Sequence, residues 1–231
     1  MLFKFKKYIS VVLLVISSVS YAEIPEDYYN TAVGKSGAEL KTALFNIIHP
    51  HTMLEYYSSS TSFRTTDWHP ATSEMPNGYF WDMYSNFKRT SWSDMNREHC
   101  LPKSWFGISS DEVNSAPIAT DLHNLYPSDA TANSRKNNYP LGIVLDDPES
   151  NGVIKVGSNT YPGYTGTVFE PADEYKGDFA RDYMYMVTCY EDYANTWQSL
   201  GTSSMLIKGS TYPVFKQYSI NLLMEWSRNV R

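Results

Sequence analysis

A carboxylate and an imidazole lie next to each other at Glu98 and His99. A hard divalent cation prefers oxygen ligands such as the carboxylate of Glu98, and a general base that works near neutral pH is commonly an imidazole such as that of His99. Adjacent side chains of a strand point to opposite faces, so the two can share one site only where the strand twists or ends. Glu-His is a common dipeptide, and the pair needs support from a second segment.

A second polar segment spans residues 121–142 and carries three asparagines within six positions. Its pattern predicts a short strand over 121–126, followed by a helix whose cap is one of residues 128–129. Asn133 and Asn137 are four residues apart and therefore lie on one helical face. Because asparagine is a poor helix former, the segment is better explained by what its side chains contact than by helix stability. An asparagine-rich surface turn is the alternative.

These segments resemble, in order, the motifs of the bacterial endonuclease I family. The matching residues are Arg97-Glu98-His99, then Asp121-Leu122-His123-Asn124-Leu125-Tyr126-Pro127, then Asn133-x-Arg135-x-x-Asn138-Tyr139. Downstream, Gly177-Asp178-Phe179-Ala180-Arg181 is similar to another family segment. The resemblance covers residues 35–200, and the ordered series of motifs is far more specific than any one of them.

The resemblance implies an α+β fold with a ββα-metal (His-Me finger) nuclease core surrounded by helices. It also implies metal-dependent hydrolysis of phosphodiester bonds in DNA, RNA or both. Glu98 and Asn133 would bind one Mg²⁺ ion, with waters in the remaining positions. His99 would take a proton from the attacking water. Other divalent cations remain possible.

Four further residues are candidates for orienting these groups or for holding phosphate, namely Asp121, His123, Arg135 and Arg181. For the two arginines, a phosphate contact and a purely structural role are equally supported. A wider basic cluster could contact phosphate or could be ordinary surface charge; its members are Lys88, Arg89, Arg97, Lys103, Arg135, Lys136 and Arg181.

Residues 1–22 are typical of a signal peptide, with lysines first, an apolar run next and a small-x-small site at the end. We expect a soluble, exported protein, periplasmic or secreted, that consists of a single domain over 23–231 and is a monomer. Removal of the leader gives a net charge of −9, from 16 basic and 25 acidic residues. This charge disfavours broad adhesion to nucleic acid but allows a local basic cluster.

The two cysteines, Cys100 and Cys189, are predicted to form a disulfide, because an exported protein meets an oxidising environment. Two buried free thiols are the alternative. A zinc site that includes His99 and His123 is disfavoured, because no Cys-x-x-Cys or His-x-x-x-His spacing is present.

Apolar spacing predicts helices over 36–48, 177–197 and 215–226, and a strand over 79–84. The nineteen tyrosines and six tryptophans are compatible with a base-stacking surface, although aromatic residues at helical spacing are usually core. The chain stops soon after Trp226, which makes its C-terminal tail shorter than is usual for the family.

A rival hypothesis follows from this short tail: a catalytically impaired, nuclease-like protein that binds nucleic acid or a glycan without hydrolysis. Intact Glu98, His99 and Asn133 argue against it. The sequence leaves the choice between DNA and RNA open, because no sugar-reading contact is visible in it.

Overall fold

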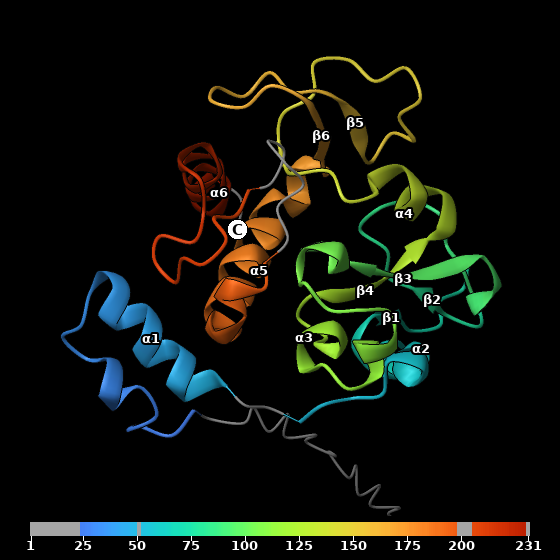
Figure 1. Ribbon diagram of the computed structural model, residues 1–231. Helices are drawn as coiled ribbons and strands as arrows, with labels where there is room; N and C mark the ends of the chain where they lie inside the picture. The colour runs from blue at the N-terminus through green and yellow to red at the C-terminus, as the bar shows by residue number, and fades with distance from the viewer. Residues whose placement is uncertain (1–23, 50–51, 198–204, 230–231) are drawn as a thin grey trace, which may run out of the picture.

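Helix α5 (Lys176–Cys189) runs through the centre of the molecule (Figure 1). The computed structural model describes residues 24–49, 52–197 and 205–229, so the predicted signal peptide lies outside the described residues. Helices α1 (Gly37–Ile48) and α6 (Gln217–Asn229) both pack against α5. Short strands and short helices, coloured cyan to green, lie on the other side of α5 (Figure 1).

Six strands lie in the described residues and pair as three antiparallel two-stranded sheets. The strands are β1 (Trp68–His69), β2 (Tyr79–Phe80), β3 (Met95–His99), β4 (Leu125–Asp129), β5 (Lys155–Ser158) and β6 (Thr167–Glu170). The sheets join β1 to β2, β3 to β4 and β5 to β6. Helices combined with these small antiparallel sheets make the fold α+β, as predicted.

The remaining α-helices of the described residues are α2 (Ser59–Thr66), α3 (Pro117–Thr120) and α4 (Ala130–Lys136). Short 3₁₀ turns connect the larger elements: η1 (Asn30–Ala32), η2 (Tyr56–Ser58), η3 (Trp92–Asp94), η4 (Lys103–Trp105), η5 (Asp111–Asn114), η6 (Asp173–Tyr175) and η7 (Glu191–Asn195). No helix in the described ranges combines the length and hydropathy needed to cross a membrane.

Strand β4 leads directly into helix α4, and α4 packs on both β3 and β4. The helix begins after Asp129, whose carboxylate accepts hydrogen bonds from the backbone N–H groups of Thr131 and Ala132 at 3.0 and 3.1 Å. Such a cap satisfies donors that the first turn leaves without a helical partner. Residue 129 is therefore the cap, one of the two positions predicted.

Strand β4 lies later in the chain than the predicted strand over 121–126. Asp121 accepts the backbone N–H of His123 at 2.9 Å, which closes a turn there and delays the strand to Leu125. Pro127 lies within β4 opposite Arg97; a proline is tolerated there because a two-stranded sheet has only edges.

The predicted helices are present with shifted ends. Helix α1 matches 36–48 closely, α5 ends at Cys189 instead of 197, and α6 spans Gln217–Asn229. Strand β2 covers only the first two residues of the predicted 79–84. The apolar stripe of α5, which includes Phe179, Tyr183 and Met186, is fully buried and forms the centre of the main core.

Candidate active site

A pocket of about 290 Å³ opens where β3 ends. Its walls come from η2, from β3 and the turn after it, and from α4 with the residues that follow that helix. The lining residues are Tyr56, Arg97, Glu98, His99, Pro102, Lys103, Ser104, Asn133, Asn137 and Asn138. The pocket thus brings together Glu98, His99 and Asn133 of the sequence motifs.

Glu98 and His99 share this pocket because His99 is the last residue of β3. The strand pairs with β4 through Glu98 opposite Tyr126 and His99 opposite Leu125, and the chain then turns away. Alternation of side chains between faces holds only inside a strand. Because β3 ends at His99, the side chains of two adjacent residues can face the same pocket.

Asn133 reaches the pocket from the second turn of α4. Its amide Nδ2 donates to the backbone carbonyl of Arg97 at 3.3 Å, which fixes the amide beside β3 and leaves its Oδ1 oxygen to accept other contacts. Asn137 ends the helix with a positive φ of 50°, a conformation that asparagine adopts more readily than most residues. That turn places Asn137 and Asn138 at the rim of the pocket.

Lys136 is fully buried and is the counter-ion of Glu98. Its Nζ donates to Glu98 Oε1 at 2.5 Å and to the backbone carbonyl of His99 at 2.9 Å. Burial raises the pKa of the Glu98 carboxyl, and the charge of Lys136 opposes that rise. From the sequence, Lys136 was interpreted as a phosphate contact or as ordinary surface charge. Both interpretations are wrong, because the side chain is buried against Glu98.

The ring of His99 is held on three sides. Its Nε2 lies 2.9 Å from the carbonyl oxygen of Ala119, the ring of Tyr56 stacks on it at 5.9 Å, and Phe106 meets it edge-on at 5.6 Å. A carbonyl can only accept, so Nε2 carries the proton in the neutral ring and Nδ1 keeps its lone pair. Burial lowers the pKa of His99 to about 3, so the ring is neutral at pH 7.

Asp121 lies outside this pocket and is a structural anchor. Its Oδ2 accepts hydrogen bonds from the hydroxyl groups of Tyr185 and Tyr190, both at 2.8 Å. These bonds tie the turn after α3 to α5. Since Ala119 precedes this turn by two residues, the anchor supports the carbonyl that contacts His99.

His123 and Arg181 lie together at a second hollow of about 390 Å³ beside α5. His123 is exposed and its ring packs against Tyr185 at 4.8 Å. Arg181 forms an ion pair with Asp178, one helical turn away, at 2.6 Å. Neither residue lines the pocket that holds Glu98 and His99.

Arg135 also lies away from Glu98, although it is on α4. Its guanidinium forms an ion pair with the nearly buried Asp147 at 2.7 Å. Asp147 accepts the backbone N–H of Val156 as well, at 2.8 Å. Arg135 therefore stabilises the loop between α4 and β5, which is a structural role.

The predicted disulfide is wrong: no bond joins Cys100 to Cys189 in the structure, and both thiols are buried. Cys100 contacts Asp182 of α5, whereas the thiol of Cys189 lies 3.9 Å from the carbonyl of Ile48. Asp182 and Cys189 are seven residues apart on one helix, roughly 10 Å along its axis. A disulfide requires Cα atoms within about 7 Å, so the two thiols occupy different levels of α5.

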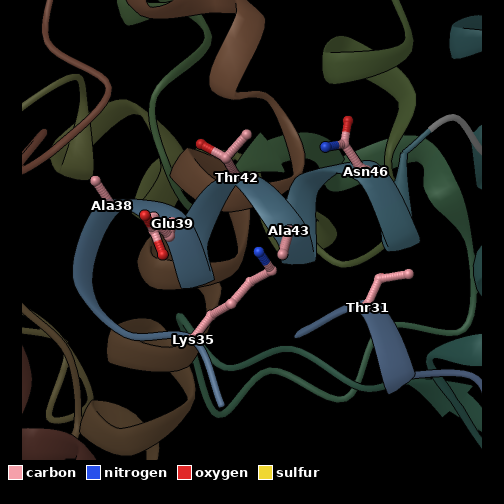
Figure 2. A pocket seen from close by; sticks show the side chains of 7 residues that line it. All are labelled: Thr31, Lys35, Ala38, Glu39, Thr42, Ala43 and Asn46. Atoms are coloured by element: carbon pink, nitrogen blue, oxygen red, sulfur yellow. The ribbon is translucent and has the colours of Figure 1, made fainter. Parts of the chain in front are cut away.

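A larger hollow of about 740 Å³ lies over α1 and η1 (Figure 2). Figure 2 shows Lys35 and Glu39 in it, together with small and uncharged side chains. Its lining contains no imidazole, and the smaller pocket at β3, which has one, is the better candidate. Within residues 24–49, 52–197 and 205–229, no three His, Cys, Asp or Glu side chains are placed to hold a metal ion together.

The fold is α+β, and one pocket is lined by an acid, an imidazole and an amide. Comparison with known proteins identifies the family. The model of the family described as Endonuclease I matches residues 36–230, and the chain belongs to this family. Two relatives are both named extracellular ribonuclease. The one from Bacillus amyloliquefaciens is 32% identical over 88% of this chain, and the one from Bacillus subtilis (strain 168) is 31% identical over 95%. The chain spans 65% and 71% of these relatives' own lengths.

Proposed function

We propose that this chain is an exported, metal-dependent endonuclease that hydrolyses phosphodiester bonds of RNA, DNA or both. The observation that carries the proposal is the convergence of Glu98, His99 and Asn133 on one pocket. In this proposal β3, β4 and α4 are the ββα-metal core of the domain. The match to the Endonuclease I model and the names of the two relatives support the reaction class.

Glu98 and Asn133 are the residues that would hold one Mg²⁺ ion. Lys136 occupies Oε1 of Glu98, and the described residues give Oε2 no hydrogen bond; the Asn133 amide likewise has its Oδ1 available. A pocket of 290 Å³ has room for several waters of about 30 Å³ each, and Mg²⁺ keeps several waters with few protein ligands. The donor set therefore fits a hydrated Mg²⁺ ion. When bound, such an ion stabilises negative charge on the phosphate and on the departing oxygen.

His99 is the general base of the proposed reaction. Its lowered pKa keeps the ring unprotonated at neutral pH, and the Ala119 carbonyl directs the Nδ1 lone pair as the acceptor. A neutral, oriented imidazole can take the proton of a water that attacks phosphorus. The Tyr56 ring and the Phe106 edge hold that orientation.

RNA is the first substrate to test, because both relatives are named ribonucleases. Arg97 and Lys103 supply positive charge at the pocket wall, in a chain whose net charge is −6 before processing. Secretion is proposed from the leader-like residues 1–22 and from the extracellular location in the relatives' names.

The deciding experiment is cleavage of RNA and of plasmid DNA by the purified protein, with Mg²⁺ and with EDTA. We expect cleavage only with Mg²⁺. His99→Ala should lose ~10²–10⁴-fold in turnover and should keep its metal affinity, measured by calorimetry. Glu98→Ala should instead weaken metal binding, so that its residual activity rises with added Mg²⁺.

Two outcomes would contradict the assignment. If extra metal restores His99→Ala, the imidazole is a metal ligand. If the protein binds nucleic acid but cleaves neither substrate, the rival hypothesis of a binding protein without hydrolysis is correct.

A further inference from the structure

Two neighbouring tyrosines belong to η2, and the first of them lines the pocket. The ring of Tyr56 is nearly parallel to that of His99, at 10° and 5.9 Å. The ring of Tyr57 is next, 5.4 Å from that of Tyr56. Tyr57 is 67% exposed, and it belongs to neither hydrophobic cluster of the described residues. Its ring is available for a contact that the fold does not use.

Positive charge lies beside both rings. The guanidinium of Arg97 is 5.4 Å from the Tyr56 ring and 6.0 Å from the Tyr57 ring. It is held in place by Ser59, whose Oγ accepts from Nε at 2.8 Å, and by the carbonyl of Tyr57, which accepts from Nη2 at 2.6 Å. The ammonium group of Lys103 lies 5.7 Å from the Tyr56 ring. A fixed cation next to an exposed ring suits a nucleotide, because its base stacks while its phosphate is attracted.

Part of the pocket lining is polar and uncharged. It includes Asn137 and Asn138, and the Asn138 amide donates to the hydroxyl of Ser104 at 3.3 Å. Amide and hydroxyl groups can bond base edges or sugar hydroxyls. The pocket lining therefore combines aromatic and cationic groups with uncharged hydrogen-bonding groups.

We propose that the Tyr57 ring, supported by Tyr56 and Arg97, is a stacking site for an unpaired base of a single-stranded nucleic acid. The site rests on the function proposed above, since it lies beside the pocket where the phosphodiester would be cleaved. A base inside a duplex has both faces covered by its neighbours and cannot stack on a side chain. The substrate class that this surface fits is thus single-stranded RNA or DNA.

The test is an affinity measurement in EDTA, so that neither metal nor turnover enters it. The probes are a short fluorescein-labelled oligouridylate, its deoxy counterpart and a blunt duplex of the same length, followed by fluorescence anisotropy. Tyr57→Ala should weaken binding of the single strands about 10-fold, because stacking on an aromatic ring contributes that order of affinity per base. Its effect on the duplex should be small.

Two controls accompany this variant. Tyr57→Phe keeps the ring and should bind as the wild type does. Tyr29→Ala removes another exposed tyrosine, 43% exposed and near α1, and should leave affinity unchanged. Equal loss for the ribo and deoxy strands indicates pure stacking, and a larger loss for the ribo strand adds a sugar contact at the same site; both results support the proposal.

The proposal is overturned if Tyr57→Ala binds single strands as tightly as the wild type does, or if it loses as much affinity for the duplex. It is also overturned if Tyr57→Phe loses as much as Tyr57→Ala, since the hydroxyl would then be the contact. Failure of the wild type to cleave would contradict the proposed function alone, because this binding test needs no cleavage. Normal cleavage with unchanged binding by Tyr57→Ala would remove only the stacking site.

Discussion

At the scale of single residues, the pair of Glu98 and Lys136 decides the electrostatics of the pocket. Both side chains are nearly or fully out of solvent, and their charged atoms are in direct contact. A buried pair of this kind adds little to stability compared with apolar residues, whereas the loss of one partner leaves an uncompensated charge. Lys136 also fixes the carbonyl of His99, so the pair links the proposed metal ligand to the proposed base.

Lys136→Met should lower the free energy of unfolding by about 3–5 kcal/mol at pH 7, because the Glu98 carboxylate then remains buried without a counter-ion. Urea denaturation followed by tryptophan fluorescence measures this loss. The double variant Glu98→Gln, Lys136→Met removes both charges and should recover most of it. A single variant as stable as the wild type would show that the pair does not compensate buried charge.

The site residues differ in how far sequence could predict them. Glu98, His99 and Asn133 belong to ordered motifs, and the structure brings all three to one pocket. Arg135 and Arg181 stand in the same motifs but form local ion pairs. The role of Lys136 as the buried counter-ion of Glu98 was missed, because a lysine in a polar helix is normally solvated. Its spacing of three residues from Asn133 was the signal that could have placed it on the same helical face.

At the scale of elements, the fold orients His99 through the turn that follows α3. Asp121 ties this turn to α5 through two tyrosine hydroxyls, and the carbonyl of Ala119, in α3 just before the turn, contacts the imidazole. A displacement of this turn would therefore rotate or release the ring. The predicted role of Asp121, to orient groups of the site, stays a prediction, and this indirect path is the route by which it would act.

Asp121→Ala should reduce turnover more than it raises KM, because the substrate surface is intact while His99 loses its orienting carbonyl. Its free energy of unfolding should fall by about 2–4 kcal/mol, since two tyrosine hydroxyls lose a charged acceptor. Tyr190→Phe removes one of the two bonds and should retain most of the turnover. Steady-state kinetics on RNA separates kcat from KM, and an effect on KM alone would contradict this indirect role.

Local patterns predicted elements better than they predicted long-range contacts. Apolar spacing located α1, α5 and α6, because a helix that packs one face on the core has apolar residues every three to four positions in its sequence. The position of β4 was missed because a side-chain turn at Asp121 competes with strand formation. The separation of Cys100 from Cys189 was also missed. The two residues are far apart in the chain, so the distance between them depends on how α5 packs in the folded protein, which local sequence patterns do not give.

At the scale of the whole molecule, buried carboxyl groups make stability depend on pH. Burial raises the pKa of Asp67 to about 6 and also raises those of Asp82 and Glu98. Each such group binds its proton more tightly in the folded than in the unfolded state. Its contribution to stability is therefore complete at low pH and is lost as the pH rises through its folded pKa. The low pKa of His99 acts in the opposite direction, since its buried ring resists protonation.

Asp67 gives the clearest test, because it is buried at the end of α2 and its folded pKa of about 6 lies well above the ordinary value of 3.8. Asp67→Asn has no proton to lose, so its stability relative to the wild type should increase by about 1–3 kcal/mol between pH 4 and pH 8. All other titrations are shared and cancel in this difference, which urea denaturation at each pH measures. Thr66→Val removes the hydroxyl that donates to Asp67 Oδ2 at 2.5 Å, so the carboxyl should titrate higher and the loss of stability should move to higher pH. A difference between Asp67→Asn and the wild type that stays constant over this range would exclude Asp67 as a source of the pH dependence.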